Sequence, residues 1–138
     1  MPSDAVVDSG YTIPIQRVQA IVELAQRRGV DIGTILADAG IATSLLQEGR
    51  SRVTGAQASD LIRRLWRVTD DELLGLGLQP VPRGTFRLVC FGLLNAGDVR
   101  AGVERFASFN RSLPGVPPLD LSEDGEIARL SFDISAVP

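Results

Sequence analysis

The sequence predicts an α+β fold in which a predominantly helical part of about six helices is followed by a β-hairpin. Up to about residue 113, apolar residues recur at helical spacing between capping residues and glycines. Between residues 119 and 134, apolar and polar residues instead alternate around an Asp124-Gly125 turn, which is typical of a hairpin. The length of 138 residues fits a single domain.

The first helix is predicted to follow a leader. Residues 1–13 are polar and unpatterned, so we expect a flexible leader there and the domain itself at 14–138. Pro14 suits the first position of a helix, because that position needs no N–H donor, and Gly29 ends the helix. Further helix starts are predicted at capping residues: Asp31, Thr43 or Ser44, Thr54, Thr69-Asp70 and Asp98. The cap at Thr69-Asp70 would lead into a short helical run over 73–78, and the acidic run 70–72 is then explained by capping and not by a cation.

The segment 86–94 is apolar almost all round apart from Arg87, so periodicity leaves a strand and a buried helix open. The sequence Asn95-Ala96-Gly97 ends it cleanly, which favours a buried helix. Within it, Cys90 is expected to be a buried and inert thiol. A redox-sensing thiol is the alternative, and it requires an exposed sulfur beside Arg87.

The hairpin over 119–134 is too small to form a stable sheet in water by itself. Three explanations remain open. The hairpin packs on the helices, it pairs with another chain, or it belongs to a larger sheet that is truncated where the sequence stops at Pro138.

The composition excludes several chemistries. The chain has no His, all 14 basic residues are Arg, and Cys occurs once. Catalytic relays that use His, a Schiff-base lysine, a lysine-containing phosphate loop and a cysteine-rich zinc site are therefore absent. We expect a binding protein and not an enzyme, with no cofactor and no metal.

The charge is nearly balanced overall, at 14 − 17 = −3, but unevenly distributed. Residues 50–67 carry 5 − 1 = +4 and residues 119–138 carry 1 − 5 = −4. The arginines at 63, 64 and 67 are expected to form a solvated helix face or a docking surface in preference to a DNA site. No segment is long and apolar enough for a membrane span, and no signal peptide is evident, so we expect a cytoplasmic protein.

A series of short blocks resembles the N-terminal effector-binding (arabinose-binding-like) domain of AraC/XylS-like bacterial transcription regulators, in order and spacing over about four-fifths of the chain. The blocks are Arg28–Asp31, Leu36–Ile41, Leu65-Trp66, Thr69–Asp71, Leu74–Leu76, Pro82–Phe86, Gly92–Leu94 and Val103–Leu113. Asp98-Val99 and Asn110 depart from the usual pattern of that family, close to the presumed pocket wall.

The resemblance implies a regulatory domain that senses a small-molecule effector or mediates homodimerisation. In that family a C-terminal pair of helix-turn-helix motifs binds DNA, and no such segment follows Leu113 here, so contact with DNA is expected only through a domain that this sequence lacks. A ligand-free dimerisation or partner-docking module is the alternative function.

Eight residues are the candidate effector-binding residues, because aromatic side chains and a few polar anchors are typical of small-molecule pockets. A plain helical core is the alternative explanation for the aromatic ones. The candidates are Trp66, Phe86, Arg87, Cys90, Phe91, Phe106, Phe109 and Asn110.

Overall fold

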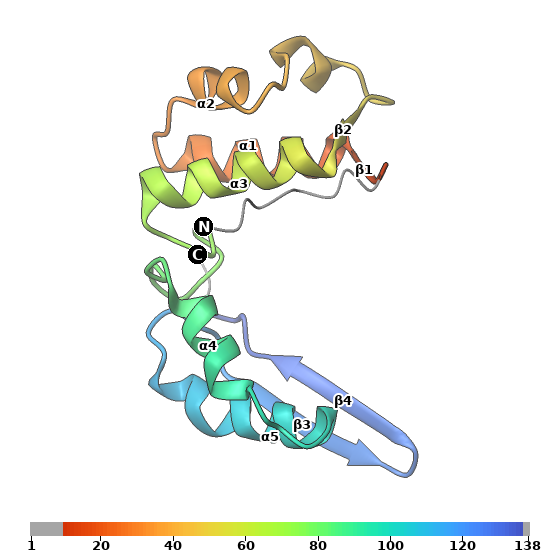
Figure 1. Cartoon of the computed structure of the whole chain (residues 1–138). Helices are drawn as coiled ribbons and strands as arrows, with labels where there is room; N and C mark the ends of the chain where they lie inside the picture. The colour runs from red at the N-terminus through yellow and green to blue at the C-terminus, as the bar shows by residue number, and fades with distance from the viewer. Residues whose placement is uncertain (1–9, 137–138) are drawn as a thin grey trace. The chain divides into compact units, whose positions relative to one another are not determined.

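The computed structural model describes residues 10–136 (Figure 1). Within them the chain forms five α-helices, two short 3₁₀ helices and two antiparallel two-stranded sheets, which confirms the α+β class. The chain divides into two compact units at residue 69, and each is described by itself below. Residues 1–9 of the predicted leader lie outside the described part, and its last residues already belong to a strand.

The first unit is built around two long helices, α1 (Ile15–Arg27) and α3 (Gly55–Thr69), which run roughly parallel in Figure 1, with α3 in front of α1. The short α2 (Ile32–Asp38) contacts both of them. A 3₁₀ helix, η1 (Thr43–Gln47), takes the place of the predicted third helical turn.

Two three-residue strands close this unit: β1 (Thr12–Pro14) pairs with β2 (Arg52–Thr54) in antiparallel register. The Arg52 guanidinium reinforces the pairing, because it donates to the hydroxyl and the carbonyl of Thr12 at 2.6 and 2.8 Å. Pro14 is therefore the last residue of a strand and caps α1 from outside the helix, one position earlier than the sequence predicted.

Glycines end both of the first two helices, as the sequence predicted. Gly29 and Gly40 have φ of 72° and 70°, a conformation that side chains with a Cβ rarely adopt. The amide of Val30 donates to the carbonyl of Ala25 at 3.1 Å, which is the reverse turn that commonly follows a helix. These turns direct the chain back so that α1, α2 and α3 pack closely.

The predicted caps at Asp31 and Thr54 are confirmed. The Asp31 carboxylate accepts from the amide of Gly33 at 3.2 Å. The Thr54 hydroxyl accepts from the amide of Gln57, and the Gln57 side chain accepts in return from the amide of Thr54. This reciprocal pair satisfies two amides that the first turn of α3 leaves without helical partners.

The core of the first unit is apolar and closed. Its buried side chains come from the three helices, from β2 and from the turn after α2, and their spacing on α1 and α3 follows the helical period that the sequence showed. They are Ile15, Val18, Val22, Ala25, Leu36, Ala39, Ile41, Val53, Ala58, Leu61 and Leu65.

The second unit begins with a loop, residues 70–84, where the sequence predicted a short helix over 73–78. That prediction is wrong: the segment turns back on itself, with φ of 49° at both Asp70 and Leu74. Gly77 and Gly115 meet where the loop passes the segment before the hairpin, and a Cβ on Gly115 would lie 2.2 Å from the carbonyl oxygen of Gln79. Only glycine fits so close to a backbone oxygen.

The acidic run 70–72 holds this loop together. Asp71 is fully buried, and its carboxylate accepts from the amides of Leu73, Gly75 and Val81 at 2.8–3.0 Å. The Glu72 carboxylate accepts from the amides of Gly84 and Phe86, both at 2.7 Å, and so caps the following helix from a distance. The prediction that these acids cap backbone amides is therefore correct, but the amides belong to the loop and to the start of the following helix. The acids do not begin a helix of their own.

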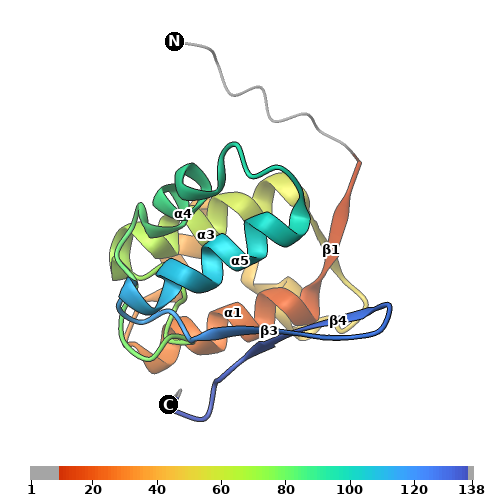
Figure 2. The ribbon, with the colours of Figure 1, turned by 90° about the horizontal axis from the view of Figure 1, so that it is seen from below.

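The rest of the second unit consists of α4 (Thr85–Leu93), α5 (Val99–Phe109), the 3₁₀ helix η2 (Asn110–Ser112) and a hairpin of β3 (Leu119–Asp124) and β4 (Ile127–Phe132). The predicted cap at Asp98 is confirmed by its bond from the amide of Ala101 at 2.8 Å. Figure 2 shows α5 alongside β3, and α5 also contacts α4.

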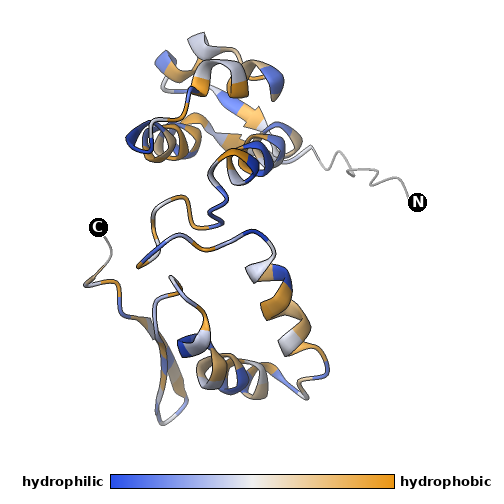
Figure 3. Cartoon of the chain, turned by 90° about the vertical axis from the view of Figure 1, so that its left-hand side faces the viewer, coloured by the Kyte–Doolittle hydropathy of each residue, from blue (hydrophilic) through white to orange (hydrophobic). Residues whose placement is uncertain are grey.

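The predicted helix over 86–94 is present as α4, but its predicted burial is wrong. No residue of α4 is fully buried, and Figure 3 shows hydrophobic colour along much of this helix. Phe86 is 66% exposed and Phe91 57% exposed. Cys90 is exposed as well, which corrects the expectation of a buried thiol.

Candidate functional site

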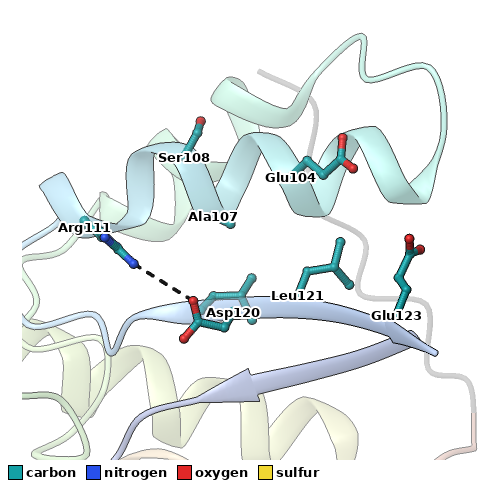
Figure 4. A pocket seen from close by; sticks show the side chains of 8 residues that line it. Glu104, Ala107, Ser108, Arg111, Asp120, Leu121 and Glu123 are labelled. Carbon is teal, nitrogen blue, oxygen red and sulfur yellow. Dashed lines mark ion pairs between the residues drawn. The ribbon is translucent and has the colours of Figure 1, made fainter. Parts of the chain in front are cut away.

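A groove runs between α5 and β3 in the second unit, with a volume of about 590 Å³ (Figure 4). Ala107 on α5 and Leu121 on β3 are half-buried apolar residues between the two elements, and Leu119 beside them is buried. Polar side chains surround this apolar floor: Glu104, Ser108, Arg111, Asp120 and Glu123.

Two ion pairs connect the helix to the strand. The Arg100 guanidinium donates to the Glu123 carboxylate at 2.5 Å, and this hydrogen bond raises the pKa of Arg100 above its ordinary value. Arg111, in η2 directly after α5, lies 4.0 Å from Asp120, and Figure 4 shows its side chain extending toward the strand. Both pairs are exposed, so each contributes little to stability and is easily rearranged.

The charges favour some ligands over others. Three carboxylates and one guanidinium line the groove. A phosphate or a carboxylate would meet more like charge than opposite charge there, whereas carboxylate oxygens readily accept hydrogen bonds from hydroxyl and ammonium donors. The groove therefore suits a small neutral or cationic molecule that carries several donors.

The structure places the eight predicted site residues elsewhere, and none of them lines this groove. Phe86, Arg87, Cys90 and Phe91 belong to α4. The Arg87 guanidinium carbon lies 5.5 Å from the centre of the Phe91 ring, a cation–π distance. These four residues form an exposed surface of mixed apolar and cationic character.

Phe106 and Phe109, also predicted, lie on α5 and contact each other edge to face, with ring centroids 5.5 Å apart. A Cβ on Gly92 would lie 3.2 Å from the Phe109 ring, so this glycine permits the close approach of α4. The aromatic pair therefore joins the two helices.

Asn110 is fully buried and donates from its side-chain amide to the carbonyl of Pro117 at 3.0 Å. Its oxygen has no hydrogen-bond partner within the described chain. This bond fixes the start of the segment that leads into the hairpin.

Trp66, the last of the eight, is half-buried on α3 in the first unit, whereas the other seven belong to the second. Near it, Arg64 donates to Asp60 at 2.6 Å and to Asp38 at 3.1 Å. The hydrogen bond from Arg64 lowers the pKa of Asp60. The arginine-rich face of α3 is thus, at least in part, an ion-paired surface, in line with the expected solvated helix face.

Sequence reasoning missed the groove residues for an identifiable reason. The alternation at 119–124 does place Leu119 and Leu121 on one face of the hairpin. No periodicity tells which helix covers that face, however, so the approach of α5 and of its charged residues was not foreseeable.

Within residues 10–136 no group of three His, Cys, Asp or Glu side chains is arranged to hold a metal ion. None of the helices in that range combines the length and the hydropathy of a membrane span.

The described residues thus form two compact units, and the second carries an open groove lined by charged side chains. Compared with protein families, residues 29–138 match the family described as the N-terminal arabinose-binding domain of AraC transcription regulators. The chain belongs to this family, which confirms the resemblance inferred from the sequence. No curated protein and no solved structure matches it.

Proposed function

We propose that this chain is the effector-sensing part of an AraC-type transcription regulator and that the groove between α5 and β3 receives the effector. The family supports a ligand-binding role, since its description names a pentose as the ligand. The observation that carries the proposal is the polar rim of the groove around an apolar floor.

A pentose is a chemically reasonable first ligand for such a groove. Its hydroxyls would donate to the carboxylates of Glu104 and Asp120 and accept from Arg111, while its C–H face would lie on Ala107 and Leu121. Small amines with several donors are the next class. Anionic effectors are the least suited, because the lining carries three carboxylates and one guanidinium.

Binding would act by population shift. A molecule that contacts both α5 and β3 stabilises the arrangement in which the two elements lie at the observed distance. A C-terminal helix-turn-helix domain, as found in AraC/XylS-like regulators, would then respond to that change. Cytoplasmic location follows from this role.

The test is a thermal-shift screen of pentoses, small amines and small carboxylates against this chain. A ligand present at 100 times its dissociation constant adds about 2.7 kcal/mol to stability, which gives a readily measured rise in Tm. We expect pentoses or amines to raise Tm and carboxylates to leave it unchanged.

Variants locate the response. Arg111→Ala and Glu104→Gln remove exposed groove residues and are expected to weaken the shift without changing the basal Tm. Arg83→Ala, an exposed residue of the 70–84 loop that is not part of the groove lining, is the matched control. If no compound of any class raises Tm, the proposal is wrong.

A second candidate function is a ligand-free dimerisation or docking module. The exposed apolar side chains of α4, among them Leu88 and Phe91, favour it. A stable dimer in light scattering combined with no response to any compound would establish it in place of the sensor.

A further inference from the structure

The outer edge of the hairpin is an open hydrogen-bonding edge. The hairpin turns through the two residues Gly125 and Glu126, and Gly125 has φ of 59°. A two-residue turn closes on a hydrogen-bonded pair, here Asp124 with Ile127, and the hydrogen-bonded pairs then alternate along the ladder. The amides and carbonyls of Ala128, Leu130 and Phe132 consequently face away from β3. Within the described residues no strand pairs with them.

The same edge carries apolar side chains that α5 does not bury. Leu130 pairs with Leu121 and Phe132 with Leu119, so all four lie on the face of the hairpin toward α5. Leu119 is buried beneath that helix, whereas Leu130 and Phe132 are each 53% exposed. A strand added beside β4 would place its own alternate side chains against these two residues.

Charge discriminates between the strands that this edge would accept. The described hairpin segment 119–136 carries five carboxylates and one arginine, which gives 1 − 5 = −4. Two of these acids, Glu126 and Asp133, flank β4 on either side. The Ser135 hydroxyl donates to Asp133 at 2.6 Å and lowers its pKa, so Asp133 is ionised at neutral pH.

A second copy of the chain is a poor partner for this edge. Antiparallel pairing of two such edges sets outward-facing residues opposite each other, so the numbers of opposite residues sum to an even number such as 260. Each copy brings the same hairpin segment to the pair, with its net charge of −4 over residues 119–136. This like charge disfavours a second copy relative to a basic segment.

From these observations we propose that the β4 edge binds an extended segment of another protein as an added strand, with apolar residues at alternate positions and basic residues at both ends. The backbone edge supplies the hydrogen bonds, Leu130 and Phe132 select the apolar positions, and Glu126 and Asp133 select the basic ends. This interaction is independent of effector binding in the groove.

The test compares two labelled peptides of eight residues by fluorescence anisotropy. Both have Val and Thr in alternation, and one has Arg at each end where the other has Glu. We expect the Arg peptide to bind about tenfold more tightly, because two opposite-charge pairs replace two like-charge pairs. Exchanging both acids for amides, Glu126→Gln with Asp133→Asn, should remove that preference.

Backbone pairing is tested on the peptide, so that the protein stays unchanged. In an added strand, every second amide faces β4 and the others face away from it. We expect N-methylation of the amides that face β4 to abolish binding. N-methylation of the amides that face away should leave the affinity within about twofold, since only one edge of the added strand pairs. On the protein, Ala128→Pro should abolish binding while Ala128→Val retains it.

Any one of three results would overturn the proposal: equal binding of the two peptides, no binding of either peptide, or the same effect of both methylation patterns. A dimer in light scattering that Ala128→Pro dissociates would show instead that a second copy occupies the edge.

Discussion

The two units of this chain use different means to hold their structure. In the first, apolar side chains from α1, α2, α3 and β2 are buried together, and Leu61 and Leu65 are fully inaccessible. In the second, neither α4 nor α5 has a fully buried residue. Carboxylates also stabilise the second unit, because Asp71 and Glu72 accept hydrogen bonds from backbone amides of the 70–84 loop.

The difference indicates a division of roles. A closed apolar core gains stability from burial alone and leaves little surface for other molecules. The second unit instead leaves apolar side chains such as Phe91 and Leu130 exposed, and exposed apolar side chains that cluster are commonly sites of interaction. The following substitutions test that comparison, from the largest expected effect to the smallest.

The largest effect is expected for Leu61→Ala, at the centre of the first unit. Loss of a fully buried leucine side chain costs about 3–5 kcal/mol in the free energy of unfolding. Phe91→Ala on the exposed face of α4 is the matched change in the second unit, and we expect it to cost less than about 1 kcal/mol. Urea unfolding measures both, with fluorescence of the single tryptophan, Trp66, as the signal of the first unit and circular dichroism as that of the whole chain. Equal costs would contradict the comparison.

Asp71→Ala is expected to destabilise the second unit by about 3 kcal/mol, because an unpaired buried amide costs about 1–3 kcal/mol. Of the three amides that lose their acceptor, that of Val81 is buried, and those of Leu73 and Gly75 regain water in part. Asp71→Asn retains one acceptor oxygen and should recover part of the loss. Substitutions at ordinary surface positions change stability by less than about 0.5 kcal/mol. A change that small for Asp71→Ala, in urea unfolding followed by circular dichroism, would contradict a stabilising role of this carboxylate.

Gly115→Ala is expected to cost about 2–3 kcal/mol, because the left-handed conformation disfavours a Cβ and the new atom also meets the Gln79 carbonyl oxygen at 2.2 Å. Gly125→Ala is the control, since Gly125 has a similar φ but no atom within 4 Å of a Cβ. It should cost about 1 kcal/mol, from the backbone alone. Thermal unfolding of the two variants separates close packing from backbone strain, and equal losses would show that the close approach contributes nothing.

Thr54→Ala removes the hydroxyl that caps α3 and is expected to cost about 1 kcal/mol, measured by urea unfolding with Trp66 fluorescence. Thr54→Ser keeps the hydroxyl and should be within about 0.5 kcal/mol of the parent. If Thr54→Ser lost as much stability as Thr54→Ala, the stabilisation would come from the methyl group of Thr54 and not from the hydroxyl cap.

The smallest effect concerns the half-buried pair of Asp60 and Arg64 on α3. Because Arg64 lowers the pKa of Asp60 in the folded chain, the pair stabilises the fold at pH values above the ordinary value of 3.8, and this contribution disappears as the pH falls through the lowered pKa. Asp60→Asn should therefore be slightly less stable than the parent at pH 7 and equal to it in strong acid. A difference that stays the same at both pH values would contradict this linkage.

Local signals in the sequence were sufficient for much of the fold. Gly29, Gly40, Thr54 and Asp98 mark helix ends through contacts within a few residues, and the hairpin follows from alternation around one turn. Long-range contacts were not predictable in this way. The pairing of β1 with β2, for instance, joins Thr12 to Thr54 through strands of three residues each.

The same limit applies to the candidate site. Asp71 was recognised as a residue that caps amides, but the amide of Val81 that it binds lies ten residues away. The exposure of α4 and the approach of α5 to β3 likewise depend on tertiary packing, which overrides the local pattern of an all-apolar segment. Charged groove residues such as Arg111 therefore gave no signal of their own.

Hydrogen exchange with and without a pentose or amine effector tests the central claim most directly, because exchange reports local stability along the whole chain. The account predicts that the ligand slows amide exchange in α5 and β3, over residues 99–124, and leaves α1 and α3 unchanged. Protection confined to the first unit, or protection nowhere with a ligand that binds, would contradict it.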